Sequence, residues 1–229
     1  MVNGSQLRAL REERGWTQQQ AASRLHVTQA YLSMLERGRR PAPARLQNTL
    51  ARLFSLPATA LPLPTTAGAM SEPELAGALA TLGYPGFGHL ASHGSPARNP
   101  ADVLASALRS PTIGARLVEG LPWLASQYWE LDWRWLVREA KLHDFQNRLG
   151  YVVYLARKLA ENSARVDAAS SLREVEQMLE PSRLAREDSF AGQSLSEAER
   201  RWLRRRRPAA ARHWNLLSDL TVEQLQHAR

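Results

Sequence analysis

The chain has 229 residues, 44% of them hydrophobic, and it contains no cysteine. This length suits one or two domains with a substantial core, and the lack of cysteine excludes disulfides and thiolate metal sites. We therefore expect a protein of the reducing cytoplasm. Residues 1–16 carry charges where a signal peptide needs an apolar run. Apolar stretches all fall short of the ~20 residues that span a bilayer, so we expect no membrane contact.

The net charge of +8 is unevenly distributed along the chain. Residues 1–60 hold nine arginines and three glutamates, a net +6, and residues 200–212 hold seven arginines and no acid. The remainder of the chain is therefore acidic. Two basic zones on an otherwise acidic chain suggest a polyanion partner for at least one of them.

The first 60 residues predict short helices with short connections. A first helix through Leu7 and Leu10 ends at Gly15, because glycine readily takes the left-handed conformation that terminates a helix. Thr17 and Gln20 have the spacing of a capping box, which predicts a second helix over residues 18–25.

A third helix begins after Thr28, which is a good N-cap, and ends at Gly38. Its buried face contains Leu32 and Leu35. Ala21 and Ala22 are small enough for the second and third helices to cross closely. A further amphipathic helix closes the core with Leu46, Leu50 and Leu53.

Two short capped helices joined by a tight turn are the pattern of a helix-turn-helix unit. Residues 5–57 resemble the phage-repressor and Cro-like helix-turn-helix domains of the Xre family. The residues that carry the resemblance are Thr17, Gln18, Ala21, Ala22, Val27, Thr28, Gln29, Leu32, Leu35, Glu36 and Gly38. The same pattern of leucines, alanines and caps could also build a plain helical bundle, but the cations gather at the end of the third helix.

The resemblance implies a role for each exposed position of this segment. Gln18 would hydrogen-bond a DNA phosphate, and the third helix would enter the major groove, where glutamine can pair with adenine. The expected base-reading residues are Thr28, Gln29, Ala30, Ser33 and Met34. The expected phosphate contacts, besides Gln18, are Arg37, Arg39 and Arg40. Ala30 can contact a thymine methyl group but cannot donate or accept a hydrogen bond.

The remainder of the chain also predicts helices, and the expected fold class is all-α. We expect a helix-turn-helix domain over residues 1–60, a Pro/Gly-rich linker with room for a short helix over 61–100, and a helical oligomerisation or partner-binding domain over 101–229. Ser71, Asn99, Asp132 and Ser196 are candidate helix caps. An apolar seam on one long helix is predicted from Leu142, Phe145, Leu149, Val152, Ala156 and Leu159, either as core or as a dimer contact.

Residues 121–160 are rich in large aromatic side chains. Such residues fill cores, but they also dominate protein interfaces. Our candidates for partner or oligomer contact are Trp123, Tyr128, Trp129 and Trp133, together with Arg204, Arg205, Arg206 and Arg207. The arginine run could bind DNA phosphate, RNA or an acidic protein surface. The aromatic stretch is similar to the C-terminal domains of Xre-type antitoxins that accompany nucleotidyltransferase-like toxins, which implies a toxin partner.

Motifs for catalysis are not apparent in the sequence. His89 and His93 lie in a Gly/Pro-rich stretch without carboxylates at metal-ligand spacing, so we expect neither an enzyme, a metal site nor a cofactor. The expected function is a DNA-binding transcriptional regulator that binds a double-stranded operator as a homodimer, represses its own promoter and neutralises a toxin. The alternatives are a homodimeric repressor without a toxin, an interaction module tethered to DNA, and an RNA-associated protein that uses residues 200–212.

Overall fold

The computed structural model describes residues 4–90, 98–190 and 195–225. Its fold is all-α, as predicted, apart from one pair of two-residue strands in the described part of the chain. The chain divides into two compact units, an N-terminal unit of residues Met1–Leu63 and a C-terminal unit of residues Pro64–Arg229. Each unit is described by itself.

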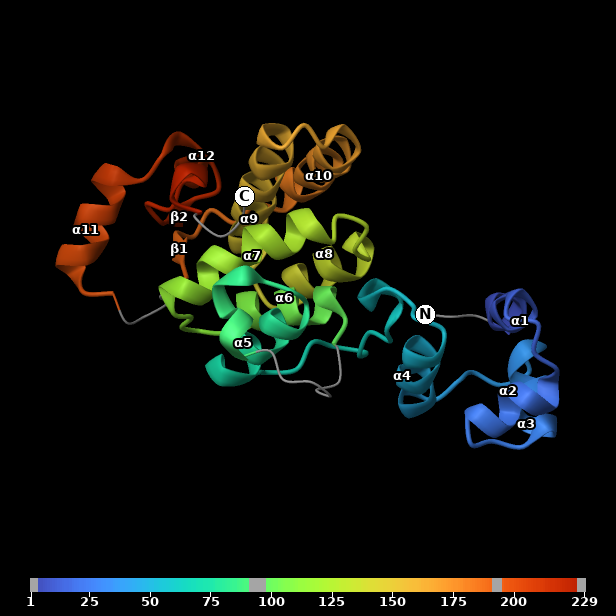
Figure 1. Cartoon of the computed structure of the whole chain (residues 1–229). Helices are drawn as coiled ribbons and strands as arrows, with labels where there is room; N and C mark the ends of the chain where they lie inside the picture. The colour runs from blue at the N-terminus through green and yellow to red at the C-terminus, as the bar shows by residue number, and fades with distance from the viewer. Residues whose placement is uncertain (1–3, 91–97, 191–194, 226–229) are drawn as a thin grey trace. The chain divides into compact units, whose positions relative to one another are not determined.

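The N-terminal unit is a small helical bundle (Figure 1). Its elements are α1 (Gly4–Glu13), α2 (Gln18–Arg24), α3 (Gln29–Glu36), α4 (Ala44–Leu53) and a 3-10 turn, η1 (Ala58–Ala60). One core cluster joins the four helices, and Leu7, Leu25, Leu32 and Leu50 are buried in it. The small residues Ala21 and Ala22 are also buried there, which is consistent with the close crossing predicted for α2 and α3.

The predicted helix ends of this unit are confirmed. Thr17 and Gln20 form the capping box of α2, and the Thr28 side chain accepts a hydrogen bond from the Tyr31 amide at the start of α3. Gly15 and Gly38 have φ angles of 66° and 68°, so both glycines hold the left-handed conformation expected after a helix.

The C-terminal unit contains eight helices in its described residues and short connecting turns. The α-helices are α5 (Glu72–Thr81), α6 (Pro100–Arg109), α7 (Ala115–Gln127), α8 (Trp133–Leu142), α9 (Gln146–Asn162), α10 (Val166–Leu179), α11 (Glu197–Arg206) and α12 (Ala209–His213). The remaining elements are the 3-10 turns η2 (Pro85–Leu90), η3 (Glu180–Ser182) and η5 (Val222–Gln224), and the strands β1 (Asp188–Ser189) and β2 (Leu216–Leu217). The predicted caps Asn99, Asp132 and Ser196 each accept a backbone N–H at the start of a helix.

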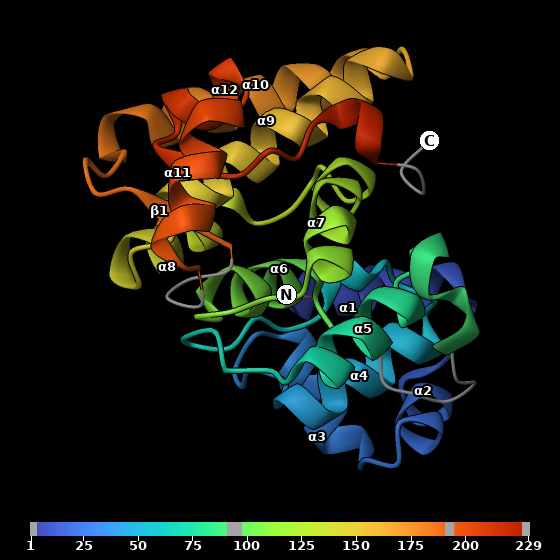
Figure 2. The same ribbon diagram turned by 90° about the vertical axis from the view of Figure 1, so that its left-hand side faces the viewer.

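Helix α9 is the centre of this unit, and α10 runs beside it (Figures 1 and 2). Leu149, Val152 and Ala156 are each fully buried, so the apolar seam is core and is not free for a dimer contact. Phe145 is the N-cap of α9 and the seam positions from Leu149 to Leu159 lie on that helix, so the predicted helix is confirmed except at Leu142, which ends α8. The chain breaks between α8 and α9 at Asp144, whose φ of 57° is left-handed, and Leu142 is left 62% exposed. Aspartate tolerates this conformation better than most residues, which explains a helix end without glycine.

The segment that we expected as a linker, residues 61–100, supplies packed elements to the C-terminal unit. The capping box at Ser71 begins α5, as predicted. After it, Tyr84 and Phe87 are buried and their rings meet edge to face with centroids 5.6 Å apart. Residues Pro85–Leu90 therefore form a folded 3-10 turn within the stretch that we expected as a linker.

The last part of the chain folds back onto α9. Strand β2 pairs in parallel with β1, and Arg148 of α9 forms an ion pair with Asp188 at 2.8 Å. The Tyr151 hydroxyl donates a hydrogen bond to the Leu220 carbonyl. Gly150 lies directly beneath the Trp214 ring, at a separation that leaves no room for a Cβ atom.

Candidate nucleic-acid interface

Helices α2 and α3 are joined by a tight turn at His26 and Val27. His26 takes a φ of 53°, which redirects the chain after α2. The buried side of α3 carries Leu32 and Leu35, so the opposite side faces solvent. On that side Thr28, Gln29 and Ala30 are exposed, while Ser33 and Met34 are partly exposed. The five expected base-reading residues therefore lie together on the start and the outward side of one helix.

Thr28 has a structural task besides any contact to DNA. Its hydroxyl oxygen accepts the Tyr31 amide at 3.2 Å, so the oxygen is occupied while the hydroxyl hydrogen can still be donated. Gln29 follows directly and is exposed at the first position of α3. Its amide group has both a donor and an acceptor, which are the two functions that adenine presents in the major groove.

The loop after α3 carries Arg37, Arg39 and Arg40, all exposed. Within the described residues these three side chains have neither hydrogen-bond nor ion-pair partners. The loop itself is fixed: the Arg39 amide donates to the Met34 carbonyl at 2.9 Å, and the buried Gln47 side chain donates to the Ala42 carbonyl at 2.8 Å. Uncommitted guanidinium groups on a fixed loop are available to donate charge-assisted hydrogen bonds to phosphates.

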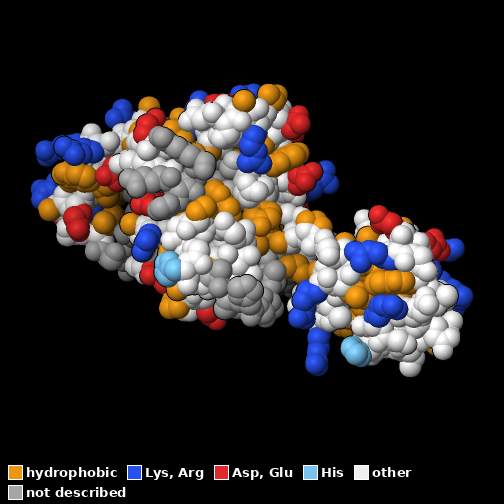
Figure 3. Space-filling model, in the orientation of Figure 1, with side chains coloured by type: hydrophobic (Ala, Val, Ile, Leu, Met, Phe, Trp, Pro, Cys, Tyr) orange, Lys and Arg blue, Asp and Glu red, His pale blue; other side chains and the backbone are white. Residues whose placement is uncertain are grey.

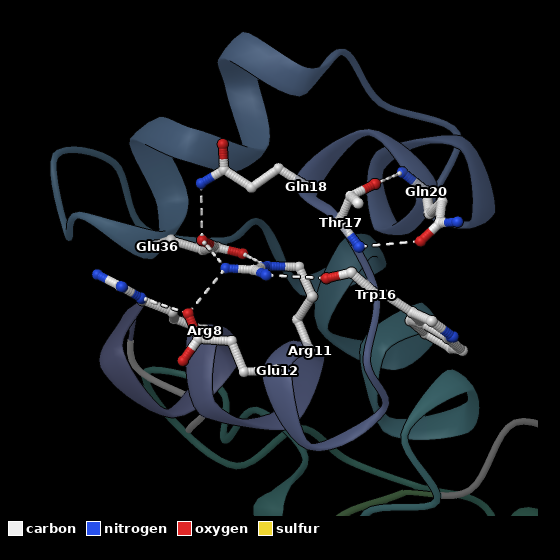
Figure 4. Close-up of polar contacts among 8 residues, drawn as sticks. All are labelled: Arg8, Arg11, Glu12, Trp16, Thr17, Gln18, Gln20 and Glu36. Atoms are coloured by element: carbon white, nitrogen blue, oxygen red, sulfur yellow. Dashed lines mark hydrogen bonds and ion pairs between the residues drawn. The ribbon is translucent and has the colours of Figure 1, made fainter.

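A buried ion pair joins the first and third helices (Figure 4). Arg11 of α1 contacts Glu36 of α3 through two hydrogen bonds, Nε to Oε1 at 2.6 Å and Nη2 to Oε2 at 3.1 Å. Arg11 also donates to the Trp16 carbonyl at 2.9 Å. The hydrogen bonds that Arg11 donates to Glu36 raise the pKa of the Arg11 guanidinium above its ordinary value. This pair holds the start of the domain against the end of α3.

Gln18 belongs to the same cluster. Its Nε2 donates a hydrogen bond to Glu36 Oε2 at 2.9 Å (Figure 4), so one of its two amide hydrogens is committed within the protein. The family resemblance implies a phosphate contact for Gln18, and the sequence around it gives no sign of the Glu36 partner. Glu36 was noted only as part of the family pattern, although a carboxylate at the C-terminal end of a helix is electrostatically unfavourable. That position is the sequence signal that could have indicated a buried cation beside it.

Two comparisons with known proteins gave no match, either among curated proteins or among solved structures. The comparison with protein-family models matched residues 4–63 to a family described as a helix-turn-helix domain. The N-terminal unit is a helix-turn-helix domain. The matched range covers α1 to α4 and η1. The C-terminal unit lies outside the match.

The aromatic candidates for partner contact lie in the C-terminal unit. Trp133 is buried with 8% exposure, and its indole N–H donates to the Trp129 carbonyl at 2.8 Å. Trp123 is partly exposed, and its ring lies 5.2 Å from that of Tyr84. The Tyr128 hydroxyl donates to the Leu82 carbonyl at 2.8 Å. These side chains have structural roles in the unit, and Trp123, Tyr128 and Trp129 keep some exposed surface.

The four candidate arginines at residues 204–207 divide into two kinds. Arg204 and Arg207 both bind Glu187, at 2.8 Å and 3.2 Å. Arg205 and Arg206 are exposed at the end of α11. Sequence reasoning treated the run as one group, because the acid that binds two of its members lies at least 17 residues away along the chain.

Metal ligands do not gather in the described part of the chain, where the structure contains no group of three His, Asp or Glu side chains that could hold an ion. His89 is exposed within η2, and His93 lies outside the described residues. Among the described residues, the structure also contains no helix with the length and hydropathy of a membrane span.

Proposed function

We propose that the protein is a sequence-specific transcriptional regulator whose α3 reads an operator in the major groove of double-stranded DNA. The observation that carries this proposal is the placement of Thr28, Gln29 and Ala30 at the exposed start of α3. When a helix-turn-helix unit docks on DNA, the side chains at the start of its second helix, which is α3 in this protein, contact the base edges. Ser33 and Met34 would contact the groove one turn later.

The arginines of the loop after α3 would contribute affinity without sequence information. Arg37, Arg39 and Arg40 are exposed next to the reading helix. Gln18 would donate its second amide hydrogen to a phosphate while Glu36 holds the first. This arrangement gives Gln18 a fixed direction, so the contact would need little reordering of the side chain.

The proposal is tested by measuring binding to a selected set of random duplexes and to the promoter of the protein's own gene. Gln29→Ala should weaken binding to the best duplex by about 1–3 kcal/mol and relax the preference at one base pair. Gln127→Ala, an exposed glutamine in the C-terminal unit, is the matched control and should bind as the unchanged protein does. If Gln29→Ala bound every duplex with unchanged affinity and preference, its role as a base reader would be refuted.

We further propose that the protein binds DNA as a homodimer. A single helix-turn-helix domain makes few base contacts, and two of them reach half-sites about 34 Å apart on one face of the duplex. Light scattering of the free protein and of its DNA complex would give the mass directly. A monomer bound to a single half-site at saturation would contradict this proposal.

The finer role that we propose is that of a cytoplasmic antitoxin. The resemblance of the aromatic stretch to antitoxin C-terminal domains supports it, as does the exposed surface that Trp123, Tyr128 and Trp129 retain. Co-purification with the protein encoded beside it tests the idea. A stable complex would assign the C-terminal unit to toxin binding, whereas a clean homodimer would favour a repressor without a toxin.

A further inference from the structure

Helix α11 carries a surface that DNA binding through α3 does not use. It consists of Arg201, Trp202, Arg205 and Arg206, which we call the arginine–tryptophan patch. Residues 201 and 205, and residues 202 and 206, are each four apart, so each pair lies on one side of the helix. Basic and hydrophobic side chains lie together at this position, at the left edge of Figure 3 where Figure 1 places α11.

The arginines of α11 and its C-cap differ in whether they have a partner within the described residues. Arg204 and its neighbour Arg207 bind Glu187 and so anchor the helix to the segment before β1. Arg201 and Arg205 are exposed and have neither an ion-pair nor a hydrogen-bond partner within the described residues. The two arginines without partners therefore belong to the patch. The two that pair with Glu187 hold in place the helix that carries it.

Trp202 is the large hydrophobic residue that α11 leaves exposed, at 47%. The Arg206 guanidinium lies 5.0 Å from the centre of its ring, so one indole face is covered by a cation. A planar ring has two faces, and the exposure that remains is available to a second stacking partner. A stacked guanidinium also restricts the indole, which lowers the entropic cost of adding that partner.

The side chains of the patch are suited to bind a polymer that carries both phosphates and unpaired, planar bases. Guanidinium groups neutralise phosphates, and an exposed aromatic ring stacks on a base of any sequence. The bases of a duplex are already stacked on one another and cannot reach such a ring without being flipped out. A membrane surface would require several exposed apolar side chains on the helix, and the described residues of α11 offer only Trp202.

We propose that the arginine–tryptophan patch of α11 binds single-stranded nucleic acid. The patch belongs to the C-terminal unit and α3 to the N-terminal unit, so the patch adds a second ligand to the proposed operator binding and does not depend on it. The full chain is tested by fluorescence anisotropy with a labelled mixed-sequence single strand of about 20 nucleotides, which exceeds typical single-strand site sizes. The same strand annealed to its complement, the selected operator duplex and phosphatidylserine vesicles are the comparison ligands.

Trp202→Ala should weaken binding to the single strand roughly 5- to 150-fold, the range that follows from the loss of one base–aromatic stack. Trp202→Phe keeps a ring and should retain most of the affinity. Arg201→Gln with Arg205→Gln should lower the slope of log affinity against log salt by about 1.4. The matched control is Arg134→Gln with Lys141→Gln, which removes two exposed cations of α8 and should leave the single-strand affinity unchanged.

The two proposals can be distinguished by measuring both ligands. Gln29→Ala should weaken binding to the operator alone, and Trp202→Ala should weaken binding to the single strand alone. The assignment of the patch would be overturned by absent single-strand binding at low salt, or by Trp202→Ala binding as the unchanged protein does. If Trp202→Ala lost the same affinity for the duplex as for the single strand, the patch would be a general phosphate-binding surface instead. Binding to vesicles in place of the oligonucleotide would assign the patch to a membrane. Circular dichroism melting confirms that each variant is folded.

Discussion

Arg11 and Glu36 form a buried ion pair that connects α1 to the end of α3, with Nε and Oε1 2.6 Å apart. The carboxylate of Glu36 also accepts a hydrogen bond from Gln18 of α2. Three helices of the helix-turn-helix domain thus meet at one side chain. The reading helix is held in place by this contact as well as by its apolar face.

Removal of one member of this pair should destabilise the helix-turn-helix domain. Arg11→Met leaves the Glu36 carboxylate buried without its cation, and the loss of one partner of a buried pair costs about 3–5 kcal/mol. The double variant Arg11→Met with Glu36→Leu should cost less than Arg11→Met alone, because it leaves no buried charge. Hydrogen exchange of amides in residues 4–63 measures the effect on this domain separately. If Arg11→Met were as stable as the unchanged domain, the pair would not have the stabilising role assigned to it.

The loop arginines should control how strongly DNA binding depends on salt. Arg39→Gln with Arg40→Gln removes two proposed phosphate contacts, so the slope of log affinity against log salt should become shallower by about 1.8. Preference among duplex sequences should not change, because phosphates carry no sequence information. The control with Arg134→Gln and Lys141→Gln makes the same charge change on α8. An equal change of slope in that control would indicate a diffuse effect of net charge.

Gly150 should not tolerate a side chain. A Cβ atom at this position would lie 2.3 Å from the Trp214 ring, which is itself buried. Gly150→Ala would push this ring out of its place against α9, and overpacking of this kind costs about 1–3 kcal/mol. Gly77→Ala in α5 is the matched control, because a Cβ atom at this position would have no neighbouring atom within 4 Å. Thermal unfolding should show a lower midpoint for the first variant only.

Asp102 should make the C-terminal unit less stable as the pH rises. Burial raises the pKa of its carboxyl, and the neighbouring Glu139 raises it further, while Arg98 opposes both. Since the folded pKa lies above the unfolded one, the stabilising contribution is present at low pH and is lost as the pH rises through the folded pKa. Asp102→Asn should therefore gain stability relative to the unchanged protein as the pH rises from the ordinary pKa of 3.8 through the raised pKa. A stability difference that is constant across this range would contradict the prediction.

Glu161 should act in the opposite direction. Hydrogen bonds from Lys158 and then Arg157 lower its pKa to about 2 from an ordinary value of 4.5. Its folded pKa is below the unfolded one, so its contribution is present above about pH 4.5 and is lost as the pH falls toward 2. Glu161→Gln should be less stable than the unchanged protein at pH 6, and the difference should shrink on acidification. Urea titrations at several pH values measure this convergence.

The sequence by itself determined the local features of this protein. The capping boxes at Thr17 and Ser196, the caps at Thr28 and Asp132, and the glycine that ends α3 all depend on residues within four positions of each other. Such contacts are set by helix geometry alone. The spacing of caps and leucines was therefore sufficient to predict the helical fold class and the exposed start of α3.

Only the tertiary structure decided which distant residues became partners. Glu36 meets Arg11 across 25 positions of sequence, and Glu187 divides the arginine run by binding Arg204 and Arg207. The break at Asp144 likewise placed Leu142 on α8, apart from the other seam residues, which lie on α9 or at its N-cap. Sequence spacing contains no information on which charges the packed helices bring together. The free energy of burying a charge requires that Arg11 and Glu36 pair inside the domain, whereas the pair of Arg204 and Glu187 is partly exposed and follows from the path of the packed chain.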